Sequence, residues 1–374
     1  MHNGCPDAYI AVHGGAGVHG QAVGKDVRRV LRQACSRAMS PFPSLAMVES
    51  ATIVLEDDPA LNAGYGSSLT LDGTVECDAA IMVGKGQRFG SVGSVPDVKN
   101  PVTLARAILE YSSKADKLGR VPPLTLVSQG ASSFAKRVSQ SSSTTSPKPE
   151  LVSPPSLISP NAKAQYDKWK ARLDDPAYHP PPLSPHFGAF PDTVGAVAWH
   201  PKDGAAASVS SGGLLLKLPG RMGEAAVYGA GCWAQHEGDN IANPSVACSV
   251  SGTGEYIVRA SLARVVGERD IDDDGSTDPH RILQTILEKD FWEEFQKEGE
   301  PNPSAGVLLL TREIDEEGKA SVRLWCAFTT PTMAIAYASP NHPKPKAVVL
   351  RHPDVCNSRH LSDKPRIFIT AIPL

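Results

Sequence analysis

Residues 188–213, which read GAFPDTVGAVAWHPKDGAAASVSSGG, contain the sharpest change of composition in this 374-residue chain. The segment that precedes Asp192, residues 139–191, is rich in serine and proline and has too little apolar surface to fold by itself. After Thr193 the chain turns into short runs of glycine, alanine and valine, a pattern that predicts two β-strands joined by a turn. We therefore expect an exposed, mobile loop over 139–191 and ordered sheet from Thr193 onward.

The rest of the chain predicts sheets that carry helices on their outer faces. Apolar residues recur at helical spacing over 24–40 and 102–111, and a short charged helix fits the middle of the serine- and proline-rich loop, 161–175. The expected strands lie near 8–12, 194–199, 205–210, 305–311 and 321–329, and the other expected helices near 44–57, 255–266 and 279–297. Closely spaced strands and runs of helices indicate antiparallel-rich sheets rather than strict βαβ units.

Two expectations concern polar side chains outside the main motifs. A helix capped by Ser44 should turn its acidic residues outward, namely Glu49, Glu56 and Asp57. Three histidines lack partners at metal-ligand spacing and are expected at the surface or in turns, namely His13, His19 and His200.

Charge and cysteine content give no sign of a nucleic-acid-binding, membrane or disulfide-rich secreted protein. A net charge of −3 gives no general electrostatic reason to bind nucleic acid or an anionic membrane, and no apolar run approaches the roughly 20 residues that span a bilayer. The first residues lack the pattern of a secretory signal. Seven cysteines without C-x-x-C spacing favour a reducing compartment over a disulfide framework or a zinc site. We expect an intracellular protein of the cytoplasm or nucleus, although no strong basic cluster signals nuclear import.

Three motifs imitate well-known sites and are rejected on context. GAGVHG, residues 15–20, matches a dinucleotide fingerprint, but two successive helices follow where a βαβ unit is needed. HGGAG resembles a lipase oxyanion loop, but the chain has no G-x-S-x-G. DIDDDG, residues 270–275, starts like an EF-hand, but its twelfth position is Arg281 instead of glutamate.

Thr193 has the surroundings of a nucleophile that is made by cutting the chain. A threonine hydroxyl needs a base, and an N-terminal threonine carries one in its own α-amine, with an ordinary pKa of about 7.7–8.0. Downstream, one compact stretch holds the hydroxyls of Ser210 and Ser211, the guanidinium of Arg221 and the carboxylate of Glu224. A glycine-rich turn in SVSGTGEYIVRAS opens a helix whose N–H groups are suited to stabilise an oxyanion.

Taken together, these stretches resemble the plant-type asparaginase family of N-terminal-nucleophile hydrolases, and within it the threonine aspartase (taspase) branch. The matching stretches are AVHGGAG, LEDDPALNAGYGSSLTLDGTVECDAAIM, GSVGSVPDVKNPVTLARAIL, GRVPP, DTVGAVAW, VSSGGLLLKLPGRMG, YGAGCWA and SGTGEYIVRASLARVV. They cover roughly residues 8–135 and 192–266, whereas the last hundred residues match weakly.

The resemblance implies one catalytic domain, 1–374, with a four-layer αββα sandwich. It implies self-cleavage between Asp192 and Thr193 into an α subunit, 1–192, and a β subunit, 193–374, which stay together and pair into an α2β2 assembly. Thr193 would then be the nucleophile and would use its own α-amine as base.

The resemblance also assigns the other site residues. Ser211 matches the hydroxyl that assists the nucleophile, and Ser251 and Gly252 match the oxyanion hole. Arg221 matches the arginine that binds the substrate carboxylate. Asn62 matches a position close to the nucleophile, and Glu224 and Gly254 occupy substrate-binding positions. No catalytic cofactor and no catalytic metal are implied; carbonyls of the 55–65 loop hold a structural sodium in asparaginase relatives.

Two substrate classes remain open. Asp192 before the nucleophile, and the stretches SSGGLLLK and GCWA, favour an endopeptidase that cuts protein substrates after aspartate. Glu224 departs from both patterns, because asparaginases have an aspartate there for the substrate's α-amine and taspases have an uncharged residue. An L-asparaginase or isoaspartyl peptidase that acts on small substrates is therefore the alternative.

Overall fold

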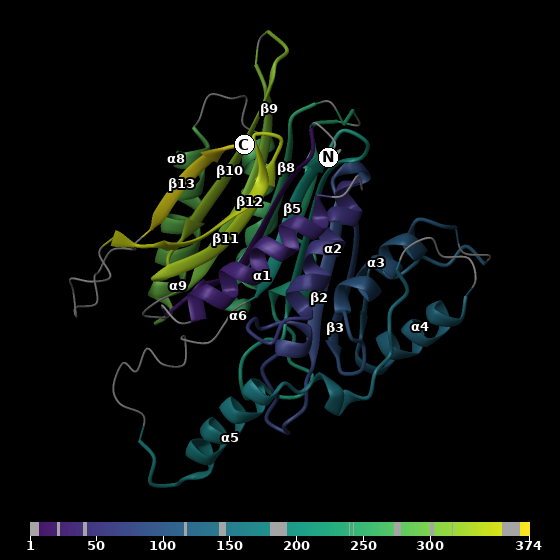
Figure 1. The fold of residues 1–374 in the computed structure, drawn as a ribbon, viewed down its shortest axis with the longest axis vertical. Coiled ribbons are helices and arrows are strands. Elements are labelled where there is room, and N and C mark those ends of the chain that lie inside the picture. The colour runs from purple at the N-terminus through teal and green to yellow at the C-terminus, as the bar shows by residue number, and fades with distance from the viewer. Residues whose placement is uncertain are drawn as a thin grey trace.

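The computed structural model describes residues 7–20, 23–39, 43–115, 118–141, 147–179, 193–238, 240–241, 243–272, 278–299, 303–315, 317–353 and 367–374. Two β-sheets pack face to face, and helices lie on the outer side of each sheet (Figure 1). This is the four-layer αββα sandwich that the sequence predicts.

The first sheet has eight strands, and segments from both sides of Thr193 alternate within it. Its order is β12 (His342–Arg351), β11 (Thr332–Ser339), β1 (Tyr9–Gly17), β5 (Val194–His200), β6 (Gly204–Ser211), β2 (Cys77–Val83), β3 (Arg88–Val95) and β4 (Thr125–Val127). All neighbours are antiparallel except β3 and β4. Strands β5 and β6 occupy the middle of the sheet, so Thr193 enters the fold at its centre.

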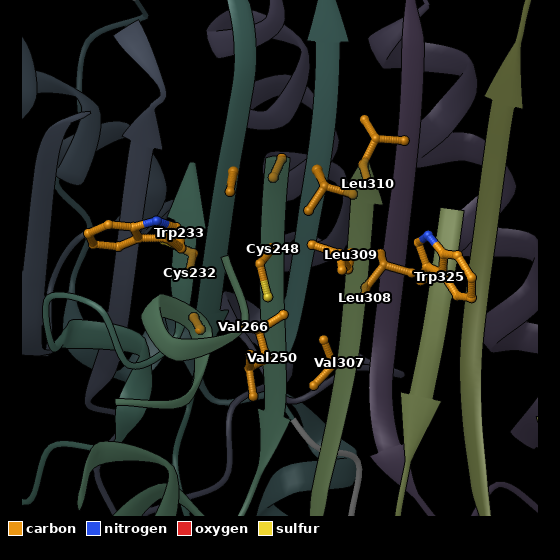
Figure 2. Close-up of a cluster of buried hydrophobic side chains, with 14 of the residues drawn as sticks. Cys232, Trp233, Cys248, Val250, Val266, Val307, Leu308, Leu309, Leu310 and Trp325 are labelled. Atoms are coloured by element: carbon orange, nitrogen blue, oxygen red, sulfur yellow. The ribbon is translucent and has the colours of Figure 1, made fainter. Parts of the chain in front are cut away.

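The second sheet contains five antiparallel strands, ordered β13 (Phe368–Pro373), β10 (Ala320–Phe328), β9 (Ala305–Ile314), β8 (Ser245–Gly252) and β7 (Cys232–His236). Its inner face joins β1, β5 and β6 in the largest hydrophobic core. Figure 2 shows Cys248 and Leu309 within that core, with Trp233 and Trp325 to either side.

Small residues allow the two sheets to approach closely behind the nucleophile. Gly195, two residues after Thr193, faces β8: a Cβ there would collide with Ser249 Oγ of β8 and would lie 2.6 Å from the Ser208 carbonyl oxygen. Real Cβ atoms do not approach other atoms so closely, so no larger residue fits without displacing a strand. Glycine at this position of β5 is thus required by the packing of the two sheets.

The helices form the two outer layers. The first sheet is covered by α1 (Val23–Ala38), α2 (Ser44–Glu56), α3 (Pro101–Ser112) and α4 (Ser128–Gln140). The second layer consists of α6 (Gly254–Ala260), α7 (Leu262–Asp272), α8 (Pro279–Thr285), the π-helix η6 (Ile286–Glu293) and α9 (Glu294–Lys297). Single 3-10 turns lie at η1 (Gly64–Gly66), η2 (Lys85–Gln87), η3 (Pro154–Leu157) and η5 (Glu224–Ala226).

Part of the serine- and proline-rich segment is folded onto the domain. Helix α5 (Pro160–Asp174), at one end of the sandwich in Figure 1, confirms the helix predicted there. The Ser159 hydroxyl caps it by accepting the Ala162 N–H at 3.2 Å. Leu157 and Ala162 are buried in a small cluster with Leu69 and other residues, so this part of the segment is not fully exposed. Residues 142–146 and 180–192, and with them Asp192, lie outside the described residues.

The predicted orientation of helix α2 is wrong. Glu49 and Glu56 are buried, because α2 packs against α1, α3, β5 and β6 and exposes only a narrow face; Asp57 alone is exposed as expected. Ser44 is the first helical residue rather than the cap. The carboxylate of Asp203, from the turn between β5 and β6, accepts the N–H groups of Ser44 and Leu45 at 2.7 and 3.2 Å.

Glu56 makes the stability of the fold depend on pH. Its Oε1 accepts hydrogen bonds from Ser210 Oγ at 2.7 Å and from the Val102 N–H at 3.1 Å. Burial outweighs these bonds and raises the pKa of Glu56 from 4.5 to about 8. The unfolded chain releases this proton above pH 4.5 while the folded chain keeps it, so stability falls as the pH rises through this window and is fully retained below it.

We expect Glu56→Gln to reduce the loss of folding stability that the parent shows as the pH rises. Glutamine has the shape of the protonated acid and cannot ionise, so the variant should match the parent near pH 5 and be more stable than it at pH 9. Urea unfolding between pH 5 and pH 9 measures this, with the exposed Glu293→Gln as control. Equal slopes for Glu56→Gln and the parent would contradict the assignment.

Candidate active site

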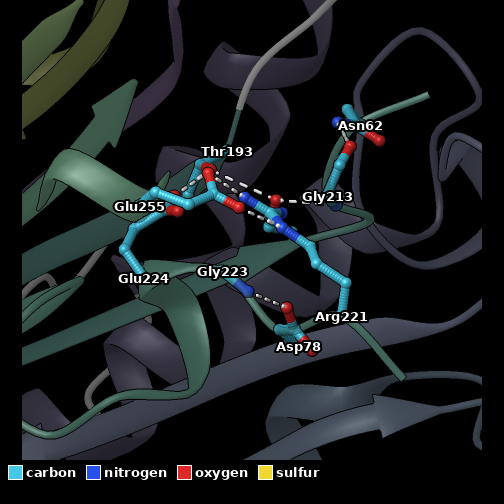
Figure 3. Close-up of polar contacts among 9 residues, drawn as sticks. Asn62, Asp78, Thr193, Gly213, Arg221, Gly223, Glu224 and Glu255 are labelled. Atoms are coloured by element: carbon cyan, nitrogen blue, oxygen red, sulfur yellow. Dashed lines mark hydrogen bonds and ion pairs between the residues drawn. The ribbon is translucent and has the colours of Figure 1, made fainter. Parts of the chain in front are cut away.

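Thr193 lies at the entrance of β5 with its side chain directed into a polar cluster (Figure 3). Only 1% of the residue is exposed. Its hydroxyl contacts Glu224 Oε1 and lies 3.2 Å from Ser211 Oγ. Because a hydroxyl carries one proton, it donates to one of these two oxygens at a time. A buried hydroxyl between a carboxylate and a second hydroxyl is placed to lose its proton.

Ser211 ends strand β6 and is held in place by the glycine pair that follows it. The Gly213 N–H donates to Ser211 Oγ at 3.0 Å, and the positive φ of Gly213, 71°, makes the tight turn. Asn62 fixes the same turn: its Nδ2 donates to the Gly213 carbonyl at 2.9 Å, and its own carbonyl accepts the Gly212 N–H at 2.9 Å. Asn62 therefore supports the turn after Ser211, and its closeness to the nucleophile stays a prediction.

Arg221 reaches the cluster from the loop after β6. Its Nε and Nη2 donate to the two carboxylate oxygens of Glu255, in α6, at 2.8 and 2.6 Å. Burial works against the charged form of Glu255, but the hydrogen bonds and charge of Arg221 prevail and lower the pKa of that carboxyl. The guanidinium thus already binds a carboxylate in the bidentate manner expected for a substrate.

Glu224 begins the η5 turn, and only 3% of it is exposed. Burial raises its pKa, although the Thr193 hydrogen bond and the charge of Arg221 act in the other direction. Gly254 leaves room for this carboxylate, because a Cβ there would lie 2.6 Å from Glu224 Oε2 and 2.9 Å from Arg221 Nη2. The structure therefore gathers Thr193, Ser211, Arg221, Glu224 and Gly254 in one place.

Asp78 and Glu255 belong to the cluster, and the sequence analysis missed both. Asp78 is a buried carboxylate in β2 that accepts the Ser94 N–H at 2.8 Å and the Gly223 N–H at 2.9 Å (Figure 3). It fixes the loop immediately before Glu224. An acid inside the apolar run CDAAIMV was the available signal. Glu255 follows Gly254 directly in a stretch that was already singled out.

Ser251 and Gly252 lie at the corner between β8 and α6. The Ser251 hydroxyl accepts the Ala16 N–H at 2.9 Å, which ties β8 to the first sheet. Gly252 has a φ of 146°, and the following Thr253 N–H donates to the Ser304 carbonyl at 2.8 Å. These contacts define the shape of the corner, while the oxyanion role of both residues stays a prediction.

The three histidines expected at the surface or in turns are buried, although His200 does directly precede the turn between β5 and β6. His13, in β1, has its Nε2 2.8 Å from Ser249 Oγ, and burial lowers its pKa to about 3 against an opposing hydrogen bond to the Thr193 backbone. His19 lies 2.8 Å from Thr332 Oγ1, and His200 ends β5. His13 and His19 hydrogen-bond to other strands, which a single sequence does not reveal, whereas His200 Nδ1 accepts the Lys202 N–H at 3.1 Å in the turn that follows β5.

The described ranges contain no group of three or more His, Cys, Asp or Glu side chains able to hold a metal ion. Around the 55–65 loop, carbonyl oxygens of Glu56 and Leu61 press against Gly64 and Gly66, where a Cβ would collide with them. Carbonyl oxygens are ligands that suit a sodium ion, and an ion at this loop stays a prediction. Among the helices that the structure describes, none is long and apolar enough to cross a membrane.

Comparison with known proteins identifies the family. A sequence profile described as Asparaginase matches residues 7–287. The chain belongs to the asparaginase family. Its members with similar sequences include the isoaspartyl peptidase/L-asparaginase of Macaca fascicularis, 33% identical over an alignment of 264 residues, with 68% of this chain and 74% of that protein covered.

Two further members are similar to the same extent. The isoaspartyl peptidase of Escherichia coli is 34% identical over 277 residues, with 68% of this chain and 74% of that protein covered. The plant-type L-asparaginase of Pyrococcus furiosus is 34% identical over 265 residues, with 68% and 77% covered. Family membership agrees with the sandwich and makes the chain a hydrolase with the N-terminal-nucleophile fold.

Proposed function

We propose that this chain cuts its own Asp192–Thr193 bond and then acts as a threonine endopeptidase that cleaves proteins after aspartate. The observation that carries the proposal is Thr193 itself, which directly follows an aspartate in the sequence and has its buried hydroxyl between Glu224 and Ser211. Once cut, Thr193 would gain the α-amine that serves as its base.

Self-cleavage and turnover would both involve an aspartate on the carbonyl side of the cut bond, which explains why one site suits both reactions. An α-linked aspartate places its carboxylate two carbons from the scissile carbonyl, which is the spacing that a bidentate guanidinium beside the nucleophile can read. Arg221 would exchange Glu255, whose side chain is half exposed, for the carboxylate of the substrate. A bond that follows Asp192 would therefore meet the same requirement as a bond in a substrate protein.

Exposed apolar side chains around Arg221 favour a protein substrate. Leu214, Leu218 and Met222 lie on the loop that carries the arginine, and 67% of Leu218 is exposed. A free amino acid or dipeptide does not reach so wide a surface, whereas residues that flank an aspartate in a polypeptide can cover it.

An isoaspartyl peptidase or L-asparaginase is the second candidate, and Glu224 is the observation that favours it. A β-linked aspartate has the same two-carbon spacing but carries a free ammonium group next to its carboxylate. The carboxylate of Glu224, close to Arg221, is a natural partner for that ammonium. The similar proteins named above carry these activities in their names.

A pair of aspartyl-glycine peptides, one with an α-linkage and one with a β-linkage, tests the proposal. We expect the mature protein to cut an acetylated α-Asp-Gly peptide and to leave intact a β-Asp-Gly peptide whose α-amine is free. Glu224→Gln in material that has been cut should retain the preference for the α-linked peptide, since no ammonium group is bound.

Cleavage of the β-linked peptide alone, with loss of that activity in Glu224→Gln, would replace the endopeptidase by the second candidate. The α2β2 assembly and the intracellular location are proposals that follow from either candidate.

A further inference from the structure

Self-cleavage faces a difficulty that turnover does not. In the uncut chain the nitrogen of Thr193 is part of the peptide bond to Asp192, so it is an amide and has no basicity to offer. Some other group must accept the hydroxyl proton during that first reaction.

We propose that Glu224 is the general base of self-cleavage, a role that rests on the proposed cut before Thr193. Its Oε1 accepts a hydrogen bond from the Thr193 hydroxyl, which is the contact that a general base needs. Its other oxygen, Oε2, faces Gly254, and the absence of a side chain there leaves the carboxylate space to stay in this orientation.

The neighbouring groups are less suited to this role. Ser211 is a hydroxyl of ordinary basicity, and its oxygen already accepts the Gly213 N–H. His13 uses its Nε2 to contact Ser249 Oγ, and burial lowers its pKa to about 3, which makes its imidazole a weak base. Burial raises the pKa of Glu224, which makes its carboxylate a stronger base than a solvated one.

The step balances with water as the only co-reactant. Thr193 Oγ gives its proton to Glu224 and bonds to the Asp192 carbonyl carbon. The C–N bond then breaks, the proton passes from Glu224 to the leaving nitrogen, and an ester with a free α-amine results. Water adds to the ester carbonyl and the C–O bond breaks, which leaves the Asp192 carboxylate and the Thr193 hydroxyl. Glu224 ends as it began.

The time course of self-cleavage, followed by intact mass after cell-free synthesis, tests this role. We expect Glu224→Gln to slow the appearance of the two fragments by about 10²- to 10⁴-fold, and Glu224→Asp to recover part of the loss. Glu49→Gln is the matched control, since it removes another buried glutamate of raised pKa far from Thr193 in sequence, on helix α2.

A pH series separates a base from a merely structural residue. Arg221 and Asp78 are the charged groups that act on Glu224, from the loop and from β2, and Glu255 in α6 is the ion-pair partner of Arg221. With these unchanged, the parent's rate should rise with pH and then level once Glu224 is ionised. The rate of Glu224→Gln should keep rising about tenfold per pH unit, because hydroxide must then remove the proton.

Hydroxylamine identifies the step that is lost. It cleaves esters and spares peptide bonds, so it should not cut uncut Glu224→Gln if formation of the ester has failed. Fragment release by hydroxylamine, or self-cleavage of Glu224→Gln at the parent's rate and pH profile, would overturn the role of Glu224 and leave the proposed function standing. A parent chain that never cuts itself would overturn the proposed function instead.

Discussion

Thr193→Ala is expected to remain a single chain of full mass and to lose turnover by about 10⁴-fold or more. The variant lacks the hydroxyl that contacts Glu224 and Ser211, so neither the first attack nor later acylation has a nucleophile. The fold should persist, because the side chain ends in a polar cluster at the edge of β5 rather than in the apolar core. Intact mass spectrometry shows whether the chain is cut, and peptide hydrolysis measures turnover. A thermal melt shows whether the fold persists.

Thr193→Ser is the matched control for this prediction. It keeps the hydroxyl and removes a methyl group, so both fragments should appear, more slowly than in the parent. Fragments that join at residue 192 in Thr193→Ala, or peptide hydrolysis at the parent's rate, would rule out Thr193 as nucleophile.

Arg221→Ala should lower kcat/KM for an α-aspartyl peptide by about 10²- to 10³-fold, because it removes a charge-assisted, bidentate contact with the acyl carboxylate. Arg221→Lys should recover only part of the loss, since an ammonium is a point charge that cannot bind both oxygens in one plane. The parallel variant Glu255→Gln shows what the loss of the existing ion pair contributes by itself.

A change of substrate makes this prediction specific. With asparagine in place of aspartate on the acyl side, the contact that Arg221 would make is already weakened. Arg221→Ala should therefore lower kcat/KM for the asparagine peptide by a much smaller factor. Equal losses for the two peptides would mean that Arg221 supports the loop and does not read the substrate carboxylate.

The elements that could be predicted from the sequence are those in which apolar residues follow one clear pattern. Helices α1 and α3 have a regular apolar stripe, and β5 and β6 are short apolar runs around a turn. Several strands were not predicted, namely β2, β3, β4, β7, β8, β11, β12 and β13, and two of them show a physical reason. Strand β8, SVACSVSG, is small and polar in composition because both its faces are packed closely, and β12 carries two prolines that only an edge strand tolerates.

The candidate site could likewise be predicted only in part. Thr193, Ser211, Arg221 and Glu224 lie within one short stretch of sequence, so their motifs indicated a common place. Asp78 comes from a strand far upstream, and only the pairing of β2 with β6, which sets Asp78 opposite Ser211, brings it there. Nor does one sequence show that α2 is enclosed on several sides, which is why Glu56 was assigned to the surface.

The alternation of strands in the first sheet has a consequence for what a cut before Thr193 would do. Strand β1 lies between β11 and β5, and β2 lies next to β6, so the two fragments would share one hydrogen-bonded ladder. The folded molecule would be held together as firmly as before. Refolding, however, would change from a reaction of one chain into an encounter of two, and its rate would depend on concentration. Maturation would thereby be a one-way event, since a dilute protein that unfolds afterwards could not easily reassemble.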